Sequence, residues 1–211
     1  MSYRLKRPLD VALVVISAPL WVPVLFMAAV VVRVGLGRGV LFRQPRAGLH
    51  SQPFEMLKLR TMTDTRDQSG NLLPDQDRLP ALGRFLRQTS LDELPGLLNV
   101  LRGDMSLVGP RPFLTQYVGR YSSHHQRRHD VRPGITGLAQ VSGRNALSWD
   151  ERLDLDVVYV DSCSLALDVR ILYKTIAAVV FRTGISPAGE VTMPEFTGSA
   201  APGSRGGENR S

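Results

Sequence analysis

Residues 11–32 read VALVVISAPLWVPVLFMAAVVV, a run of 22 residues without a charged side chain. As one unbroken helix this run would measure about 33 Å, enough to cross a hydrocarbon core of about 30 Å. A cleaved signal peptide fits less well, because the run is longer than a usual signal core and no clear cleavage site follows it. A plain transmembrane span is therefore one interpretation of the segment.

A helix that enters and leaves the membrane on the same side is the other interpretation. Pro19 and Pro23 lie inside the run, and each removes a backbone donor and obstructs the preceding turn, while Ser17 could bond a freed carbonyl. Cations, which mark the cytoplasmic side of a membrane, flank both ends of the run. They are Arg4, Lys6 and Arg7 before it and Arg33, Arg38, Arg43 and Arg46 after it. A re-entrant hairpin that breaks at Pro19 and Pro23 would keep both flanks on one side.

The charge balance points to an anionic partner. The 211 residues suffice for one domain, and Lys plus Arg outnumber Asp plus Glu by 26 to 19. Such a surface suits nucleic acid, a lipid surface or a phosphorylated substrate. Nucleic acid is not expected, because no helix-turn-helix, RNP or zinc-finger pattern is present. Cys163 is the only cysteine, which excludes an intramolecular disulfide and fits a reducing cytoplasm.

The remaining sequence predicts a small α+β, mostly helical domain. We expect a membrane helix over residues 1–36, a cytosolic catalytic domain over 37–197 and a disordered tail over 198–211. Periodicity and turn residues predict short strands at 40–43 and 54–59, helices at 79–86, 91–101, 113–129, 149–159 and 167–181, and loops at 64–77 and 131–147. Amphipathic patterns in the helices at 79–86 and 167–181 suggest that the latter lies on a membrane surface.

The tetrapeptide Ser90-Leu91-Asp92-Glu93 has two interpretations. Ser-x-x-Glu is the pattern of a capping box, with Ser90 as the N-cap and Glu93 three residues into the helix. Asp92 and Glu93 are also an adjacent carboxylate pair at a positive helix end. Such a pair can bind magnesium through oxygen ligands, and a carboxylate can act as a nucleophile that forms an acyl phosphate.

Several cations could neutralise a phosphate bound at this pair. Arg87 lies one turn before it, and Arg111 stands between Pro110 and Pro112, which stiffen its backbone. Lys58 alternates with leucines on a predicted strand face that it shares with Arg60. Arg144 follows a glycine in a predicted loop. Each of these residues taken alone is more typical of a solvated surface cation.

Other chemistries find less support in the sequence. His124, His125 and His129 have no cysteine or carboxylate at the spacing usual for zinc, so a zinc site is not expected. No GxxxxGK[ST], GxGxxG or GxSxG pattern occurs, which argues against a P-loop, a Rossmann site and a hydrolase nucleophile.

Several motifs in order resemble the bacterial sugar transferase family, the monotopic phosphoglycosyl transferases. The resemblance runs from Lys6 to about Phe196. It rests on KRPLD at 6–10, FEMLKLRTM at 54–62, SLDELP at 90–95, NVLRGDMSLVGPRP at 99–112, VRPGITG at 131–137 and QVSGRN at 140–145. The chain resembles the minimal catalytic form of the family.

The resemblance implies a two-step transferase that releases UMP. Asp92 would attack the β-phosphorus of a UDP-sugar, giving a covalent phosphosugar-aspartate, and undecaprenyl phosphate would then take the phosphosugar. Glu93, with Asp92, would hold Mg²⁺, Arg87 and Arg111 with Pro110 would form the phosphate site, and Lys58 and Arg144 would support it. The family helix breaks at a Ser-Pro pair, and counting from Asp10 places Pro23 there, preceded by Val22.

The resemblance also implies a location and partners. The enzyme would work at the cytoplasmic face of the bacterial inner membrane and initiate glycoconjugate or exopolysaccharide synthesis. The run from Gly184 to Phe196 resembles the subgroup that uses UDP-N,N'-diacetylbacillosamine or another N-acetylated amino sugar. A homodimer is compatible with the sequence. The alternative is a catalytically inactive membrane scaffold of the same fold in a polysaccharide assembly complex, against which the intact Asp92-Glu93 pair argues.

Overall fold

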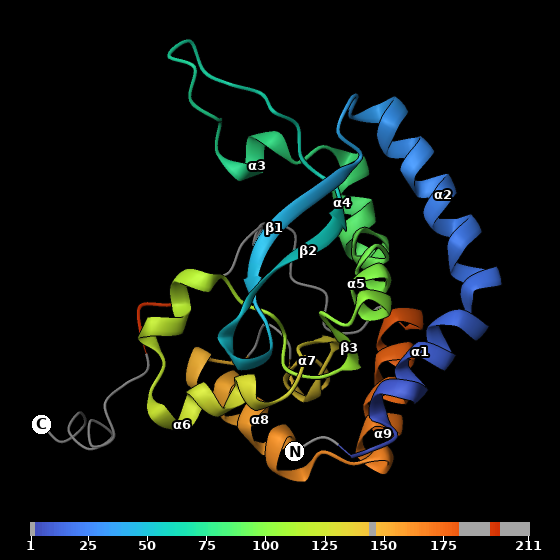
Figure 1. Ribbon diagram of the computed structural model, residues 1–211. Helices are drawn as coiled ribbons and strands as arrows, with labels where there is room; N and C mark the ends of the chain where they lie inside the picture. The colour runs from blue at the N-terminus through green and yellow to red at the C-terminus, as the bar shows by residue number, and fades with distance from the viewer. Residues whose placement is uncertain (1–2, 144–146, 182–194, 199–211) are drawn as a thin grey trace, which may run out of the picture.

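The computed structural model describes residues 3–143, 147–181 and 195–198. Helices surround two small two-stranded sheets, and the chain begins with two consecutive helices and ends its described domain with two more (Figure 1). The predicted class, mostly helical with short strands, is confirmed. The predicted tail at 198–211 lies outside the described residues except for Gly198.

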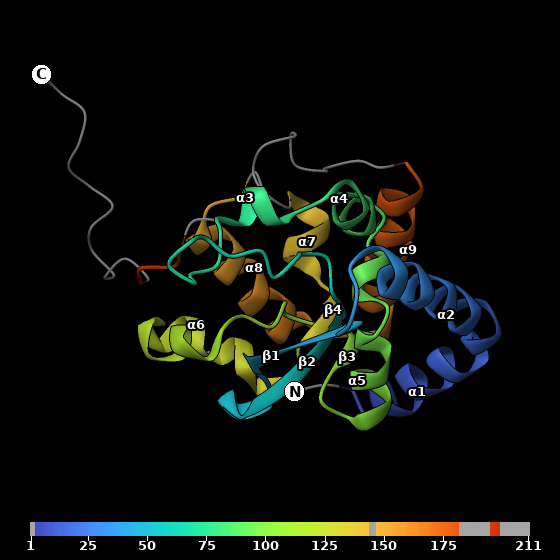
Figure 2. The same cartoon turned by 90° about the horizontal axis from the view of Figure 1, so that it is seen from above.

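The N-terminal apolar segment forms two helices, α1 (Lys6–Ile16) and α2 (Ala18–Gly35), with a bend at Ser17 (Figures 1 and 2). The Ser17 hydroxyl donates to the carbonyl oxygens of Leu13 at 2.7 Å and Val14 at 3.2 Å, as expected for a serine beside a helix break. Pro19 lies in the first turn of α2, where a missing N–H is tolerated. Pro23 was expected to mark the break, but it lies inside α2, so this part of the prediction is wrong.

Both ends of this segment pack on the same globular body. On α1, Lys6 forms a buried ion pair with Asp168 at 2.5 Å, and Asp10 accepts a hydrogen bond from Ser106 at 2.7 Å. Near the end of α2, the fully buried Val32 belongs to an apolar cluster that includes Leu59 and Leu86. The bend between the two helices lies at the edge of the molecule, away from these contacts (Figure 2).

A β-hairpin follows α2. Strands β1 (Leu41–Ala47) and β2 (Pro53–Leu59) are antiparallel and are joined by a 3-10 turn, η1 (Leu49–Ser51). The two predicted strands are confirmed, although β1 extends four residues beyond the predicted end. On β2, Met56, Leu57 and Leu59 are buried in the core.

The segment after the hairpin leads to the carboxylate pair. The predicted loop at 64–77 ends in a single helical turn, α3 (Asp75–Arg78), and helix α4 (Ala81–Gln88) follows as predicted. The predicted helix at 91–101 is split into the 3-10 turn η2 (Leu91–Glu93) and helix α5 (Gly96–Arg102). Pro95 lies between them and cannot donate a backbone hydrogen bond, which accounts for the split.

The second half of the domain departs most from the predicted elements. The helix predicted at 113–129 is replaced by η3 (Thr115–Arg120), α6 (Ser123–Gln126) and η4 (Arg127–Asp130), because its aromatic side chains pack into a tertiary cluster with Trp149 and Phe196. The predicted loop at 131–147 contains β4 (Gly134–Thr136), which pairs in parallel with β3 (Ser106–Val108), and a short helix, α7 (Leu138–Ser142). The last two predicted helices are confirmed as α8 (Trp149–Ser162) and α9 (Leu165–Val180).

Candidate active site

The Asp92-Glu93 pair lies in η2, between α4 and α5. Ser90 precedes the turn in a left-handed conformation with φ of 56°, and its side chain makes no capping hydrogen bond. The capping box is therefore not formed. A left-handed backbone is unusual for serine, and Ser90 separates the end of α4 from η2. Glu93 is therefore not used as a capping side chain, and its carboxylate meets cations from two other elements.

Glu93 is held by two cations from distant parts of the sequence. Its Oε1 accepts hydrogen bonds from Lys58 Nζ at 2.8 Å and from Arg111 Nη2 at 2.7 Å. Burial alone would raise the pKa of this carboxyl, but the charges of Arg111 and Lys58 and their hydrogen bonds hold it well below its ordinary value. Glu93 is thus a permanently ionised carboxylate that fixes both cations beside Asp92.

The pKa of Asp92 is shifted in the opposite direction, upward. Its side chain is buried, with 7% exposure for the residue, and within the described residues its carboxylate has no hydrogen bond or ion pair. Burial and the negative charge of Glu93 raise the pKa of Asp92 to about 6, against the opposing charges of Lys58, Arg111 and Arg87. Such a carboxylate is more basic than an ordinary aspartate and is not engaged by neighbouring groups, as a nucleophile requires.

Arg87 reaches this region from the last turn of α4. Its Nε donates to Thr61 Oγ1 at 3.0 Å, and its charge acts on Asp92. Gly83 brings α4 against the backbone here, because a Cβ at this position would lie 1.9 Å from the carbonyl oxygen of Thr61. The close approach places Arg87 one turn before the carboxylate pair and holds its guanidinium against the segment after β2.

The backbone around Arg111 is fixed by the small parallel sheet. The carbonyl oxygen of Pro110 accepts from Gly134 N at 2.9 Å, and Gly109 N donates to Thr136 O at 2.9 Å. A Cβ on Gly109 would lie 2.4 Å from the carbonyl oxygen of Arg132, so only glycine fits there. Pro110 therefore acts through its backbone. Its carbonyl oxygen anchors the segment that carries Arg111, a residue of the predicted phosphate site.

A second, fully buried ion pair holds the main chain of Arg111 in place. Arg128 donates from Nε and Nη2 to Asp156 Oδ2 at 3.0 and 2.8 Å, and its Nη2 also donates to the carbonyl oxygen of Arg111 at 2.6 Å. The guanidinium lies 4.4 Å from the centroid of the Phe113 ring. Neither Arg128 nor Asp156 was predicted as a site residue, because nothing in their local sequence indicates that the fold brings them to Arg111.

The predicted cations divide into those that reach the pair and those that do not. Lys58, Arg87 and Arg111 surround Asp92 and Glu93, whereas Arg144 lies outside the described residues. Arg60 follows the end of β2 and pairs with Asp64 at 3.0 Å, so it does not share the function of Lys58. Arg132 donates to the carbonyl oxygen of Gly103 at 2.8 Å.

The donor set fits a hard dication such as Mg²⁺. Asp92 and Glu93 present carboxylate oxygens from adjacent positions, and both cations that bind Glu93 use the same oxygen, Oε1. Oxygen ligands and a small number of carboxylates are what Mg²⁺ prefers when it also binds a phosphate. Asp92 and Glu93 are accordingly the residues that could hold the metal.

Comparisons with known proteins identify the family to which the chain is similar. The profile described as bacterial sugar transferase matches residues 1–182. An uncharacterized sugar transferase, EpsL of Bacillus subtilis, is 49% identical over 92% of this chain and 96% of its own. The UDP-glucose:undecaprenyl-phosphate glucose-1-phosphate transferase of Caulobacter vibrioides is 41% identical over 83% of this chain and 69% of its own. An Aeromonas hydrophila undecaprenyl-phosphate N-acetylgalactosaminephosphotransferase is 36% identical over 83% of this chain and 44% of its own.

Proposed function

The chain belongs to the bacterial sugar transferase family, and we propose that it is a phosphoglycosyl transferase that moves a sugar-1-phosphate from a UDP-sugar to undecaprenyl phosphate and releases UMP. The observation that carries this proposal is the buried Asp92 carboxylate, which makes no hydrogen bond or ion pair within the part of the chain that the structure describes and lies beside Glu93, Lys58 and Arg111. Relatives named for this reaction support the general chemistry.

In the first step, an oxygen of Asp92 attacks the β-phosphorus of the UDP-sugar. The bond between this phosphorus and the bridging oxygen breaks, and UMP leaves with the bridging oxygen and its electron pair. The phosphosugar remains attached to Asp92 as an acyl phosphate. The raised pKa of Asp92 supports this role, because a more basic carboxylate is a stronger nucleophile once it is ionised.

In the second step, a phosphate oxygen of undecaprenyl phosphate attacks the same phosphorus. The acyl phosphate bond breaks, Asp92 regains its carboxylate, and the product is a sugar joined to the lipid by a diphosphate. Arg111 and Arg87 offer guanidinium groups to phosphate oxygens, and Lys58 adds a further positive charge. Arg144 is proposed from the motif alone.

Asp92 and Glu93 are proposed to hold Mg²⁺. The bound metal would supply charge neutralisation at the diphosphate, which a carboxylate nucleophile needs in order to approach an anionic substrate. In this chain, Lys58 and Arg111 keep Glu93 ionised and in place, so that a ligand oxygen is available at any physiological pH.

We further propose that α1 and α2 form a re-entrant hairpin in the cytoplasmic leaflet of the inner membrane. α2 is long and apolar enough to cross a membrane by length and composition, and only 11% of its 18 residues are buried. The start of α1 and the end of α2 nevertheless pack on the same body, through Lys6–Asp168 and through Val32. Side chains near the bend are apolar and exposed, as in Ile16 and Leu20, each 76% exposed. A straight span would carry these two ends apart.

The sugar is proposed to be an N-acetylated amino sugar, with UDP-N,N'-diacetylbacillosamine as one candidate. The motif behind this proposal, from Gly184 to Phe196, lies mostly outside the described residues. Relatives of comparable identity are named for glucose and for N-acetylgalactosamine, so the family motifs alone do not determine the sugar. A homodimer remains a prediction that the mass of the protein in nanodiscs would test.

The test is a screen of UDP-sugars with the protein in nanodiscs, Mg²⁺ and undecaprenyl phosphate. We expect UMP release that depends on one sugar and disappears in Asp92→Asn. Release of UDP would mean direct glycosyl transfer and would refute the role of Asp92. An intact mass raised by one phosphosugar in the wild type, and not in Asp92→Asn, would establish the intermediate. Neither UMP nor an adduct with any donor would favour the scaffold alternative.

A further inference from the structure

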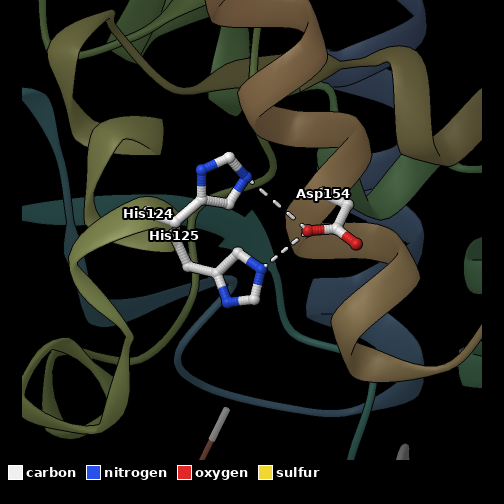
Figure 3. Close-up of side chains that lie close together, drawn as sticks. All are labelled: His124, His125 and Asp154. Atoms are coloured by element: carbon white, nitrogen blue, oxygen red, sulfur yellow. Dashed lines mark hydrogen bonds and ion pairs between the residues drawn. The ribbon is translucent and has the colours of Figure 1, made fainter. Parts of the chain in front are cut away.

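Outside the carboxylate pair, the described residues contain one group of imidazoles and a carboxylate whose ligand atoms converge. His124 and His125 lie in α6, and Asp154 lies in α8, about thirty positions further along the chain. Both imidazole rings turn toward the same carboxylate oxygen (Figure 3). A zinc site was not expected, because no cysteine or carboxylate lies at the usual zinc spacing from these histidines in the sequence, but the fold supplies a carboxylate from another helix.

We propose that His124 Nε2, His125 Nε2 and an oxygen of Asp154 form a binding site for a zinc-type transition-metal dication. One imidazole nitrogen from each histidine and one carboxylate oxygen all lie within 4.8 Å of one another. In a tetrahedral zinc site, with metal–ligand bonds of about 2.0 to 2.1 Å, neighbouring ligand atoms are about 3.3 Å apart. The two distances to Asp154 Oδ1 are 3.7 Å from His124 and 2.9 Å from His125, on either side of this value.

The ligand types favour zinc, cobalt or nickel over magnesium. Imidazole nitrogen is a borderline donor that suits these metals, whereas Mg²⁺ requires oxygen ligands and retains several waters. The site at Asp92 and Glu93 offers only oxygen. The two sites should therefore select different metals, which allows each to be tested in the presence of the other.

The surroundings of the cluster are suited to a cation. Helix α8 is rich in carboxylates in an otherwise basic chain: Asp150, Glu151, Asp154, Asp156 and Asp161. Arg127 and Arg128, which follow the histidines, are each paired with a carboxylate of α8, Asp161 and Asp156 respectively. Their positive charges are thus largely compensated and oppose a bound dication only weakly.

The three groups differ in exposure in a way that permits metal entry. The side chain of His125 is 8% exposed, and its backbone N–H is fixed by the hydroxyl of Ser122, which caps α6. The side chains of His124 and Asp154 are 57% and 44% exposed. One ligand is therefore preorganised, while the other two leave the site open to solvent, where water would complete the coordination.

A metal at this position would join α6 to α8. The turn that follows α6, η4, contains Arg128, whose guanidinium binds both Asp156 of α8 and the carbonyl oxygen of Arg111. The proposed metal would thus link α6 to α8, next to the buried ion pair that links η4 to α8. Its expected effect is a gain in thermal stability of the fold, since a ligand that binds only the native state stabilises it by mass action.

The experiment is a titration of the purified full chain, without a histidine tag, with Co²⁺ as a spectroscopic probe and then with Zn²⁺. We expect one Co²⁺ per chain with the visible absorption of a nitrogen-coordinated site, displacement by Zn²⁺, no displacement by excess Mg²⁺, and a higher Tm with Zn²⁺. Asp154→Asn and His124→Gln should weaken Co²⁺ binding about tenfold or more. These substitutions alter partly exposed side chains and leave the core unchanged.

The matched controls are Glu55→Gln, an exposed carboxylate on β2, and His50→Gln, a histidine outside the cluster. Both should bind Co²⁺ as the wild type does. Absence of Co²⁺ binding, or equal loss in cluster and control variants, would overturn the proposal and leave a plain imidazole–carboxylate hydrogen bond. Because the readout is metal absorption, it is independent of UMP release and of the function proposed for Asp92.

Discussion

The guanidinium of Arg128 donates to the main-chain carbonyl oxygen of Arg111 at 2.6 Å while it is paired with Asp156. Arg111 in turn binds Glu93 at 2.7 Å. A fully buried ion pair thus fixes the backbone of the arginine that meets the carboxylate pair. The rigidity of the candidate site depends on residues that do not themselves face it.

Asp156→Asn should destabilise the fold and slow the transferase. Removing one partner of a buried ion pair leaves the other charge uncompensated, at a cost of about 3 to 5 kcal/mol. For a chain of this size, each kcal/mol lowers Tm by about 2 to 4 °C. Thermal unfolding and the rate of UMP release measure the two effects. Asp161→Asn, which breaks the partly exposed pair with Arg127, should change Tm little, and an equal loss in both variants would contradict the prediction.

Asp92→Asn should stabilise the protein at neutral pH in the absence of metal. The folded-state pKa of Asp92, about 6, lies above its ordinary value of 3.8, so the fold favours the protonated form. The stability from this group is present below 3.8 and is lost as the pH rises through about 6. Removing the charge should therefore raise the unfolding free energy at pH 7.5 by on the order of 2 kcal/mol. Unfolding in EDTA would show it, and a lower Tm than wild type would refute it.

The first chemical step should slow as the pH falls through about 6. Only the ionised carboxylate of Asp92 can attack phosphorus, and its protonation removes the nucleophile. Glu93 stays ionised throughout this range, because Lys58 and Arg111 hold its pKa well below the ordinary value. The rate of the UMP burst, measured from pH 5 to pH 8 at fixed Mg²⁺, should follow a single ionisation. A flat profile would mean that Asp92 does not titrate in this range.

Glu93→Gln should abolish most of the activity and lower the stability. The substitution leaves Lys58 and Arg111 without the carboxylate that both bind, and it removes one proposed metal ligand. Losing a charged hydrogen-bond acceptor at a mostly buried position costs about 1 to 3 kcal/mol. The control is Glu55→Gln, whose pair with Arg43 is well exposed and should contribute little. Denaturant unfolding and UMP release of both variants measure the difference, and similar behaviour of the two would contradict it.

The hairpin makes a topological prediction that cysteine labelling can test. In a Cys163→Ser background, Arg4→Cys and Arg38→Cys should both react with an impermeant maleimide from the cytoplasmic side of membrane vesicles. Leu20→Cys, close to the bend, should be protected from both sides. The physical reason is that the start of α1 and the end of α2 pack on one body. Labelling of the first two positions from opposite sides would establish a straight span.

Sequence patterns predicted the elements that depend on local information. The leucines of α4 and the alternation in β2 are each set by neighbours in the chain. The helix expected at 113–129 failed because Phe113, Tyr117 and Tyr121 contribute to a tertiary cluster, for which a continuous helix is the wrong geometry. The break at Ser17 was missed because Pro23 is accommodated inside α2, whereas the serine bonds the carbonyls ahead of it.

The candidate site likewise combines residues that local motifs identify with residues that only the fold brings there. Asp92, Glu93, Lys58 and Arg111 lie in recognisable motifs, and the structure brings them together with Arg87. The interpretation of Ser90 and Glu93 as a capping box failed because Glu93 has stronger partners elsewhere in the fold. Arg128, Asp156 and Thr61 could not be identified, since their roles depend on contacts between residues at least 17 positions apart. A long-range contact of this kind has no periodicity or spacing that a single sequence reveals.

Because both ends of the apolar segment pack on one body, the distance from the bend at Ser17 to the carboxylate pair is fixed. Val32 of α2 belongs to the same apolar cluster as Leu91, the residue before Asp92. The separation between the exposed bend at Ser17 and the carboxylate pair is therefore set by the length of rigid helix between them. A helical turn added near the bend would leave the site intact and raise it by about 5 Å relative to the lipid. In the proposed re-entrant hairpin, the lengths of α1 and α2 would therefore determine how closely Asp92 approaches a lipid phosphate.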